Sequence, residues 1–163
     1  MPAFSKKSKK NLDSCHHSLR YLFTAIIKRV DCTILEGRRS KYKQNKAYDE
    51  GRSKLQYPLS KHNSDPSKAV DVGPYDATRK KVPWPDESVP KSVAKLIPSE
   101  LFEALEVYIK DQCLWYRFIG YVQGTADQMG IDIRSGDDWD MDWSILDQQF
   151  DDLPHHEVVV KGE

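Results

Sequence analysis

Hydrophobic residues recur at helical spacing in two long stretches of the chain. In residues 11–30 the apolar positions share one face and polar residues fill the other; they are Leu12, Leu19, Leu22, Phe23, Ile26 and Ile27. In the second stretch, Ser99 stands at a helix N-cap and the pattern runs to about Met129, with a break predicted near Gly120 or Gly124. We interpret its apolar residues as core: Leu101, Leu105, Tyr108, Ile109, Trp115, Ile119 and Val122. Two long helices are therefore predicted.

Shorter stretches have the composition and alternation of β-strands. Strands are predicted at residues 31–36, 69–72, 131–134 and 156–160, and a short helix at residues 40–50. Residues 52–63 are polar and contain Pro58, so a loop is predicted there, and four prolines make residues 76–98 an irregular connection with one short turn. Helices and strands mixed in this order indicate a small α+β domain with a short, mainly antiparallel sheet and helices packed on it.

The composition is that of one globular domain over residues 1–163. Apolar residues make up 39% and charged residues 31%, which excludes a disordered chain. Basic and acidic residues balance at 25 each, so the chain lacks the positive charge expected of a nucleic-acid-binding protein. Residues 1–10 hold four lysines and are predicted to form a flexible basic tail.

The cysteines and the N-terminus bear on the compartment. Cys15, Cys32 and Cys113 are far apart and form no CxxC pair, which argues against a disulfide framework and favours a reducing cytoplasm. No apolar segment follows the N-terminal lysines, and the apolar run at residues 22–27 is too short to span a bilayer. We expect a protein without a signal peptide and without stable membrane insertion.

Candidate metal ligands lie in the middle and at the end of the chain. His62 is followed nine residues later by Asp71, inside the strand-like run AVDV, where an unpaired buried carboxylate would be costly. Two of the five histidines, His155 and His156, stand together near the C-terminus. Two imidazoles and one carboxylate suit a zinc ion with one open position, and such sites are catalytic because zinc lowers the pKa of water to about 7. A hydrogen-bonded structural aspartate is the alternative interpretation of Asp71.

Four segments of the chain form an ordered set of motifs: EGRRSKYKQ (36–44), SKH followed by SKAVDVGPY (60–75), MGIDIRSGDDWD (129–140) and DLPHHE (152–157). In this order they resemble the motifs of the zinc peptidases of peptidoglycan. This family holds D-alanyl-D-alanine carboxypeptidases and the L-alanyl-D-glutamate endopeptidases that phages use as endolysins. Each motif is weak alone, but together they span roughly residues 31–160 and imply the DD-peptidase/hedgehog-like fold.

The resemblance implies a role for each matching residue. His62, Asp71 and His155 would be the zinc ligands. Asp152 would deprotonate the attacking water and then protonate the leaving amine, a contribution of about 10²–10⁴-fold. Arg39 would face the substrate carbonyl, where a fixed cation stabilises the developing oxyanion.

Ser60 and Gln44 are weaker candidates for substrate contacts. Glu157 either orients an imidazole or is only a charge at a strand edge. Only one of His155 and His156 is expected to be the ligand, because adjacent residues on a strand point to opposite faces. We choose His155 over His156 as the ligand, since it stands three residues after the proposed acid.

This sequence departs from the family pattern in two places. The spacing from His62 to Asp71 is longer than the compact His-x6-Asp form, so residues 63–68 carry an insertion. The residue after the liganding histidine is commonly aromatic, whereas here it is His156.

A second group of acidic residues resembles the start of a calcium loop. It consists of Asp138, Asp140 and Asp142, but Trp143 and Gln149 occupy the positions where an EF-hand needs glycine and glutamate. An EF-hand is therefore excluded, and a looser cation site stays open.

The resemblance implies a zinc-dependent peptidoglycan peptidase that cleaves the L-alanyl-D-glutamate bond of the stem peptide. We expect a monomeric phage or prophage endolysin that stays in the host cytoplasm until it is released to the wall. A D-alanyl-D-alanine carboxypeptidase is the first alternative. A non-catalytic zinc-bound module that only binds peptides is the second.

Overall fold

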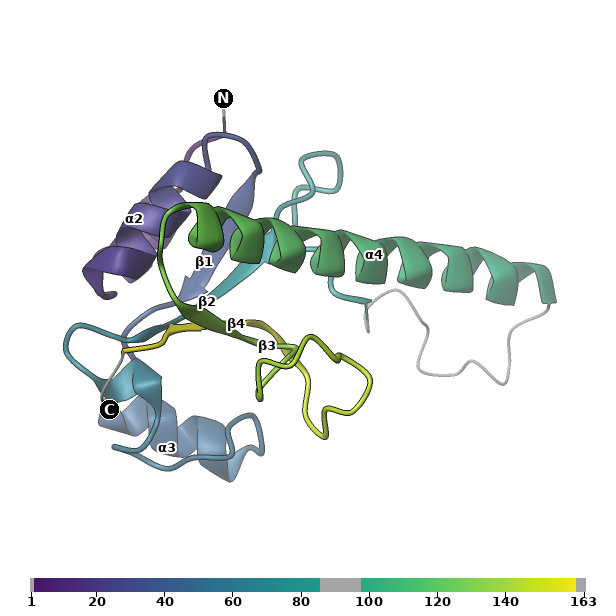
Figure 1. The fold of residues 1–163 in the computed structure, drawn as a ribbon. Helices are drawn as coiled ribbons and strands as arrows, with labels where there is room; N and C mark the ends of the chain where they lie inside the picture. The colour runs from purple at the N-terminus through teal and green to yellow at the C-terminus, as the bar shows by residue number, and fades with distance from the viewer. Residues whose placement is uncertain (1, 86–97, 161–163) are drawn as a thin grey trace.

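Four short strands form an antiparallel sheet at the centre of the molecule, in the order β1-β2-β4-β3. The computed structural model describes residues 2–85 and 98–160. The strands are β1 (Cys32–Glu36), β2 (Ala69–Pro74), β3 (Ile133–Gly136) and β4 (Asp152–Val158). The helices are α1 (Lys6–Asp13), α2 (His17–Ile26), α3 (Lys41–Asp49), the 3₁₀-helix η1 (Lys61–Asn63) and α4 (Pro98–Gln128) (Figure 1). The predicted α+β class with a mainly antiparallel sheet is confirmed.

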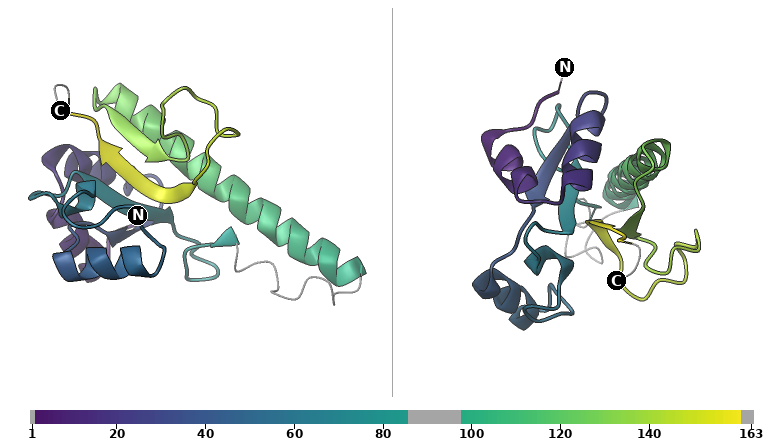
Figure 2. Two further views of the ribbon diagram at one scale, coloured as in Figure 1. Left: turned by 90° about the horizontal axis from the view of Figure 1, so that it is seen from below. Right: turned by 60° about the vertical axis from the view of Figure 1, so that its left-hand side comes forward.

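The hydrophobic core lies between one face of the sheet and three helices. α1, α2 and the C-terminal half of α4 cover this face, while α3 and η1 lie on the other side of the sheet (Figure 1, Figure 2). The buried residues of the helices are Leu12, Leu19, Leu22, Phe23, Ile26, Phe118, Val122 and Ala126. The sheet adds Cys32 and Ile34 of β1, Val70 and Val72 of β2, and Val158 of β4 to the core. The opposite face is left free for polar side chains.

The predicted basic tail is wrong for residues 6–10, which are helical. The hydroxyl of Ser5 accepts a hydrogen bond from the backbone N–H of Ser8 and so caps α1. Ser8 is buried, and Leu12 one turn later belongs to the core. The four lysines occupy the exposed face of an amphipathic helix, because its other face packs on β1.

The single helix predicted for residues 11–30 is also wrong, because the chain breaks between α1 and α2. His16 donates its backbone N–H to the carbonyl of Ser67 at 2.7 Å, and Ser67 donates to Ser14 at 2.9 Å. These bonds tie the connection to the segment that precedes β2. Hydrogen bonds to a distant segment thus replace helical ones, and hydrophobic spacing alone does not show such a change.

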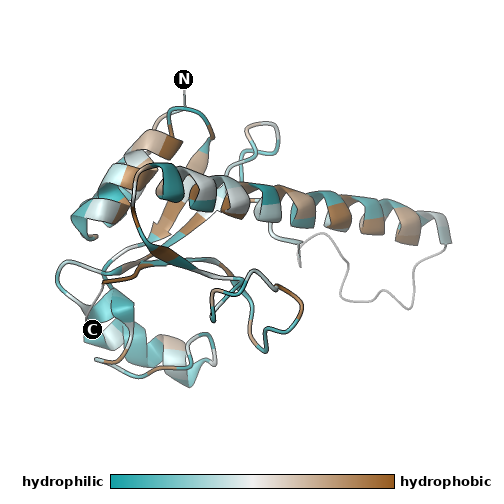
Figure 3. Ribbon diagram, in the orientation of Figure 1, coloured by the Kyte–Doolittle hydropathy of each residue, from teal (hydrophilic) through white to brown (hydrophobic). Residues whose placement is uncertain are grey.

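α4 is one continuous helix, so the break predicted near Gly120 or Gly124 is wrong. Phe118, Val122 and Ala126 flank the two glycines, pack into the core and hold the helix on the sheet. The N-terminal half of α4 extends beyond the sheet and still carries apolar residues (Figure 2, Figure 3). Leu105 and Ile109, predicted as core, are therefore 39% and 56% exposed. Trp115, Ile119 and Val122 are buried as predicted.

The strand predictions at residues 31–36 and 69–72 and the helix at residues 40–50 are confirmed, each to within two residues. β4 begins at Asp152, four residues before the predicted start. Its register with β3 shifts so that Gly136 pairs with Asp152 and Ser135 with His156. Pro154 lies within this bulge and needs no ladder N–H, which explains a proline in an interior strand.

The connection predicted for residues 76–98 falls partly on residues 86–97, outside the described residues. Within the described part of the chain, no helix has both the length and the apolar character needed to cross a membrane.

Candidate active site

Asp71 and His155 lie directly opposite each other on the two central strands, β2 and β4. Successive side chains of a strand point to opposite faces, so both leave the sheet on the face away from the helices. Val70 and Val72 point the other way, into the core. Oδ1 of Asp71 lies 3.3 Å from Nδ1 of His155. Strand alternation thus explains a carboxylate between two buried valines.

The 3₁₀-helix η1 brings His62 to the same point. The hydroxyl of Ser60 caps this helix and accepts a hydrogen bond from the backbone N–H of His62 at 3.3 Å. Nδ1 of His62 lies 2.7 Å from the carbonyl oxygen of Gly37. A carbonyl oxygen only accepts, so Nδ1 is the donor in this contact, and Nε2 faces Asp71 and His155. Metal-ligating imidazoles are held in this way.

The three donor atoms form a nearly equilateral triangle. Nε2 of His62 lies 3.0 Å from Oδ1 of Asp71 and 3.3 Å from Nδ1 of His155. Zinc–ligand bonds of about 2.0–2.1 Å in a tetrahedron place neighbouring donors about 3.3 Å apart. The triangle therefore fits one face of a zinc tetrahedron with the fourth position open. The donor set, two imidazole nitrogens and one carboxylate oxygen, also suits zinc.

Glu157 orients His155 from the side opposite the triangle. Its Oε2 lies 3.2 Å from Nε2 of His155, and its Oε1 accepts a hydrogen bond from Arg134 at 3.0 Å. Burial would lower the pKa of His155, but hydrogen bonds to Asp71 and Glu157 raise it to about 9. Of the two interpretations of Glu157, this contact favours a residue that orients an imidazole over a charge at a strand edge. The raised pKa also means that the site favours positive charge.

Arg39 holds the second oxygen of Asp71. Its Nη2 donates to Oδ2 of Asp71 at 3.0 Å, and its Nη1 donates to Oε1 of Gln44 at 3.2 Å. Burial alone would raise the pKa of Asp71, but the imidazoles of His62 and His155 hold that pKa well below its usual range. Asp71 therefore stays ionised, with one oxygen in the triangle and the other on Arg39.

Gln44 lies behind Arg39 and is fully buried. Its amide Nε2 donates to the carbonyl of Leu55 at 2.6 Å and to the hydroxyl of Ser53 at 2.9 Å. The described lining of the cleft includes Ser60 but not Gln44. Of the two predicted substrate contacts, the structure therefore brings Ser60 to the cleft surface and makes Gln44 a support for Arg39.

Asp152 begins β4 and lines the cleft beside the triangle. Burial and the charge of Asp71 raise its pKa, while His155 and His62 oppose the rise. A raised pKa suits a group that both takes and gives a proton near neutral pH. Gly136 lies against it so closely that a Cβ would collide with the Asp152 backbone. The glycine therefore permits the strand pairing that places Asp152.

His156 points away from the cleft into the core. Its side chain is fully buried, 5.9 Å from the Phe23 ring between centroids, and its Nδ1 lies 3.2 Å from the hydroxyl of Ser135. Burial lowers the pKa of His156 to about 3, so the ring stays neutral at physiological pH. The adjacent histidines thus occupy opposite faces, and His155 is the one in the triangle.

A cleft of about 960 Å³ opens over the triangle. Its lining includes His62, Asp71, Asp152 and His155 together with apolar side chains. The ring centroid of Trp139 lies 5.2 Å from that of His155. Sequence analysis singled out the segment that contains Trp139, but the contact with His155 depends on the fold.

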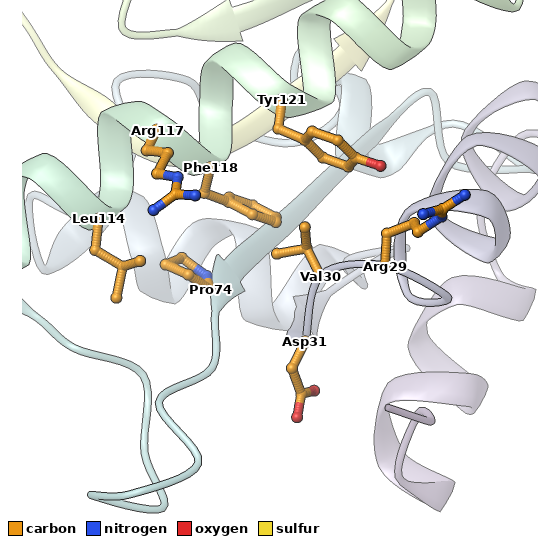
Figure 4. A pocket seen from close by; sticks show the side chains of 8 residues that line it. All are labelled: Arg29, Val30, Asp31, Pro74, Leu114, Arg117, Phe118 and Tyr121. Atoms are coloured by element: carbon orange, nitrogen blue, oxygen red, sulfur yellow. The ribbon is translucent and has the colours of Figure 1, made fainter. Parts of the chain in front are cut away.

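A second pocket, of about 790 Å³, lies between α4 and the start of β1. Figure 4 shows its mainly apolar lining, with Phe118 and Tyr121 from α4 facing Val30 and Pro74. Among the described residues that line it, Asp31 is the single carboxylate and there is no histidine. This lining offers no metal-ligand set, so the cleft over the triangle is the candidate active site.

The acidic residues Asp138, Asp140 and Asp142 also come together, with ligand oxygens within 4.8 Å of one another. The two carboxylate oxygens of Asp138 accept the backbone N–H groups of Asp142 at 3.2 Å and Trp143 at 3.0 Å. These bonds organise the loop between β3 and β4. The looser cation site that the sequence left open is not decided by this arrangement.

Comparisons with known proteins agree with the geometry. The sequence profile of the family described as phage L-alanyl-D-glutamate peptidase matches residues 2–117. The crystal structure of the Serratia marcescens L-Ala D-Glu endopeptidase ChiX has a TM-score of 0.61 at 19% identity, over 96% of this chain and 90% of that chain. That likeness shows a shared fold. No curated protein sequence matches the chain. The profile match includes Arg39, His62 and Asp71 and ends before the C-terminal residues of the site.

Proposed function

This chain belongs to the phage L-alanyl-D-glutamate peptidases, and from that premise we propose that it is a zinc enzyme whose metal ligands are His62, Asp71 and His155. The observation that carries the proposal is the triangle of donor atoms, with sides of 3.0, 3.3 and 3.3 Å, at the base of the cleft. Both imidazoles are oriented from behind, one by the Gly37 carbonyl and the other by Glu157. A zinc ion held there would supply Lewis-acid activation of water and of the substrate carbonyl.

Asp152 acts as the proton carrier in this mechanism. Its carboxylate takes a proton from the attacking water and then passes it to the nitrogen of the leaving amine. The raised pKa of Asp152, caused by burial and by Asp71, supports both transfers. The amide bond is broken, the alanyl carbonyl gains the water oxygen, and the amine leaves neutral.

The guanidinium of Arg39 has two roles in this mechanism. Its contact with Oδ2 of Asp71 turns Oδ1 toward the two histidines. Its position on the cleft lining supports its second role, as a fixed cation that stabilises the negative charge developing on the substrate carbonyl oxygen. Gln44, held by Leu55 and Ser53, keeps the guanidinium in place from behind.

The substrate is the stem peptide of peptidoglycan, cleaved between L-alanine and D-glutamate, and we place the enzyme in host lysis as an endolysin. Purified protein should be incubated with peptidoglycan and the released peptides identified by mass spectrometry. Peptides that begin with D-glutamate support the proposal. Free D-alanine as the product would instead indicate the carboxypeptidase alternative.

Zinc dependence is tested on the same preparation. We expect about one zinc per chain by elemental analysis, loss of activity on chelation, and recovery when zinc is returned. Full activity in a metal-free sample would contradict the zinc proposal but leave the cleaved bond unaffected. Zinc binding without any turnover would favour the alternative of a module that only binds wall peptides.

A further inference from the structure

The cleft is lined by several cations, and most of them are already engaged. Arg39 pairs with Asp71, Arg134 with Glu157 and Arg52 with Glu50. Lys61 also has a partner. These side chains line the cleft, and each of the three arginines is paired with a carboxylate of the protein.

Lys54 differs from these cations. Among the residues that the structure describes, its ammonium has no carboxylate partner and instead lies 5.2 Å from the centroid of the Phe150 ring. A cation–π contact of this kind positions an ammonium while leaving its hydrogen-bond donors available. Lys54 thus presents an unbalanced positive charge on the lining of the cleft.

The contact with Phe150 also relates this charge to the segment that leads into β4. Phe150 precedes Asp152 by two residues, so their Cα atoms are at most about 7 Å apart. Asp152 is the residue that hands a proton to the leaving amine in the proposed mechanism. The ammonium and Asp152 therefore line the same cleft, and Phe150, which holds the ammonium, belongs to the segment that leads into Asp152.

The leaving group of the proposed reaction carries a carboxylate. The scissile nitrogen belongs to D-glutamate, and the wall peptide continues through the side-chain carboxyl of that residue. The α-carboxylate is then free, on the same carbon that bears the scissile nitrogen. An anion two bonds from the scissile nitrogen would be stabilised by a cation beside the leaving-group side of the cleft.

We propose that Lys54 binds the free α-carboxylate of this D-glutamate, with Phe150 as its positioning residue, and so makes the enzyme select wall peptides whose glutamate is not amidated. The inference rests on the proposed cleavage between L-alanine and D-glutamate. A charged hydrogen bond to the carboxylate disappears when the substrate carries a neutral amide there. Selection between the two peptides therefore measures this contact directly.

The test compares two synthetic stem peptides that differ only at that carboxyl, one free and one amidated, with the zinc-loaded full chain. Wild type should have about a tenfold or greater preference in kcat/KM for the free acid, the size expected for one charged hydrogen bond. Lys54→Met should lose most of that preference through slower cleavage of the acid, and Lys54→Arg should keep it. Phe150→Leu should reduce the preference in part. Lys46→Met, an exposed lysine of α3 outside the cleft lining, is the matched control and should leave it unchanged.

Each outcome bears on the inference. If Lys54→Met lowers kcat/KM equally for both peptides, or keeps the full preference for the free acid, the inference is overturned. The proposed function would stay in place. A wild-type enzyme that cleaves neither peptide between alanine and glutamate would contradict the proposed function, and this inference with it. Because Lys54 is exposed, its variants should keep the wild-type melting temperature.

Discussion

The two faces of β2 and β4 have opposite chemistry, although the same two strands build both. One face carries Asp71, His155 and Glu157, linked to one another by polar contacts. The other carries Val70, His156 and Val158, packed under α2 and α4. Alternation along two paired strands is enough to separate a candidate metal centre from a hydrophobic core by the thickness of a sheet.

The comparison of His155 with His156 shows what makes a histidine a candidate ligand. Both rings are buried, at 7% and 0% exposure. His155 has a carboxylate on each side within 3.3 Å, and these contacts raise its pKa to about 9. His156 makes no such contact with a carboxylate of the described residues, and burial lowers its pKa to about 3. The residues around a buried imidazole, more than its burial, therefore decide whether its pKa is raised or lowered.

The largest expected effect comes from substituting His155, and the comparison is a substitution of His156. His155→Ala should abolish zinc binding and reduce lytic activity by about a thousandfold or more, since the metal supplies several kcal/mol of transition-state stabilisation. His156→Phe should keep zinc and most activity, with a loss of about 1–3 kcal/mol of stability from overpacking against Phe23. Metal content and turbidity assays measure both. Retained zinc in the first variant and lost zinc in the second would reverse the assignment of the two faces.

The next effect separates chemistry from metal binding on the polar face. Asp152→Asn should retain zinc but lose about 10²–10⁴-fold in kcat, because the amide cannot carry the proton. The neighbouring Asp151→Asn is the control and should stay active, since Asp151 is exposed and does not line the described part of the cleft. Zinc analysis alongside peptide kinetics gives both readouts. Comparable losses in the two variants would argue against Asp152 as the proton carrier.

A smaller effect is expected from the residue that supports the polar face. Arg39→Lys should keep zinc and fold but lose about tenfold or more in kcat, because an ammonium cannot contact Asp71, Gln44 and the substrate with one planar group. Arg38→Lys should be nearly silent, since Arg38 pairs with Asp65 at the surface. If Arg38 proved the more sensitive of the two, the assignment of the EGRRS segment would be shifted by one residue.

The smallest effect should be on the fold itself. Removing zinc should lower the melting temperature by about 10 °C, as expected when a ligand present at about a thousand times its dissociation constant is lost from a domain of this size. The protein should nevertheless stay folded, because the core lies on the other face of the sheet. Calorimetry with and without a chelator measures the shift. Complete unfolding of the metal-free chain would mean that the two faces are not independent.

The elements of the fold were predicted unevenly. β1, β2 and α3 follow local patterns, and each is where the sequence indicates. The break between α1 and α2 was missed because it depends on hydrogen bonds with Ser67, a residue distant in the sequence. The exposed N-terminal half of α4 was missed because its apolar spacing continues after the sheet that would cover it has ended.

The grouping of His62, Asp71 and His155 was predicted from residue types and from the family resemblance, and the structure confirms that they meet. The roles of Asp152 and Arg39 stay predictions. The sequence does not predict which groups orient the two imidazoles. The carbonyl of Gly37 could not be singled out, because every residue has a carbonyl, and Glu157 had two interpretations.

The sequence by itself determined the ligand types, their order and the alternation that places His155 and His156 on opposite faces, because strand geometry depends only on neighbouring residues. Only the tertiary structure decided that Asp71 pairs with His155 in register and that η1 brings His62 within 3.0 Å of that pair. The same holds for Lys54 and Phe150, which are 96 residues apart and meet only when β4 is paired. Distances between such segments are set by packing and strand register, which are properties of the whole chain.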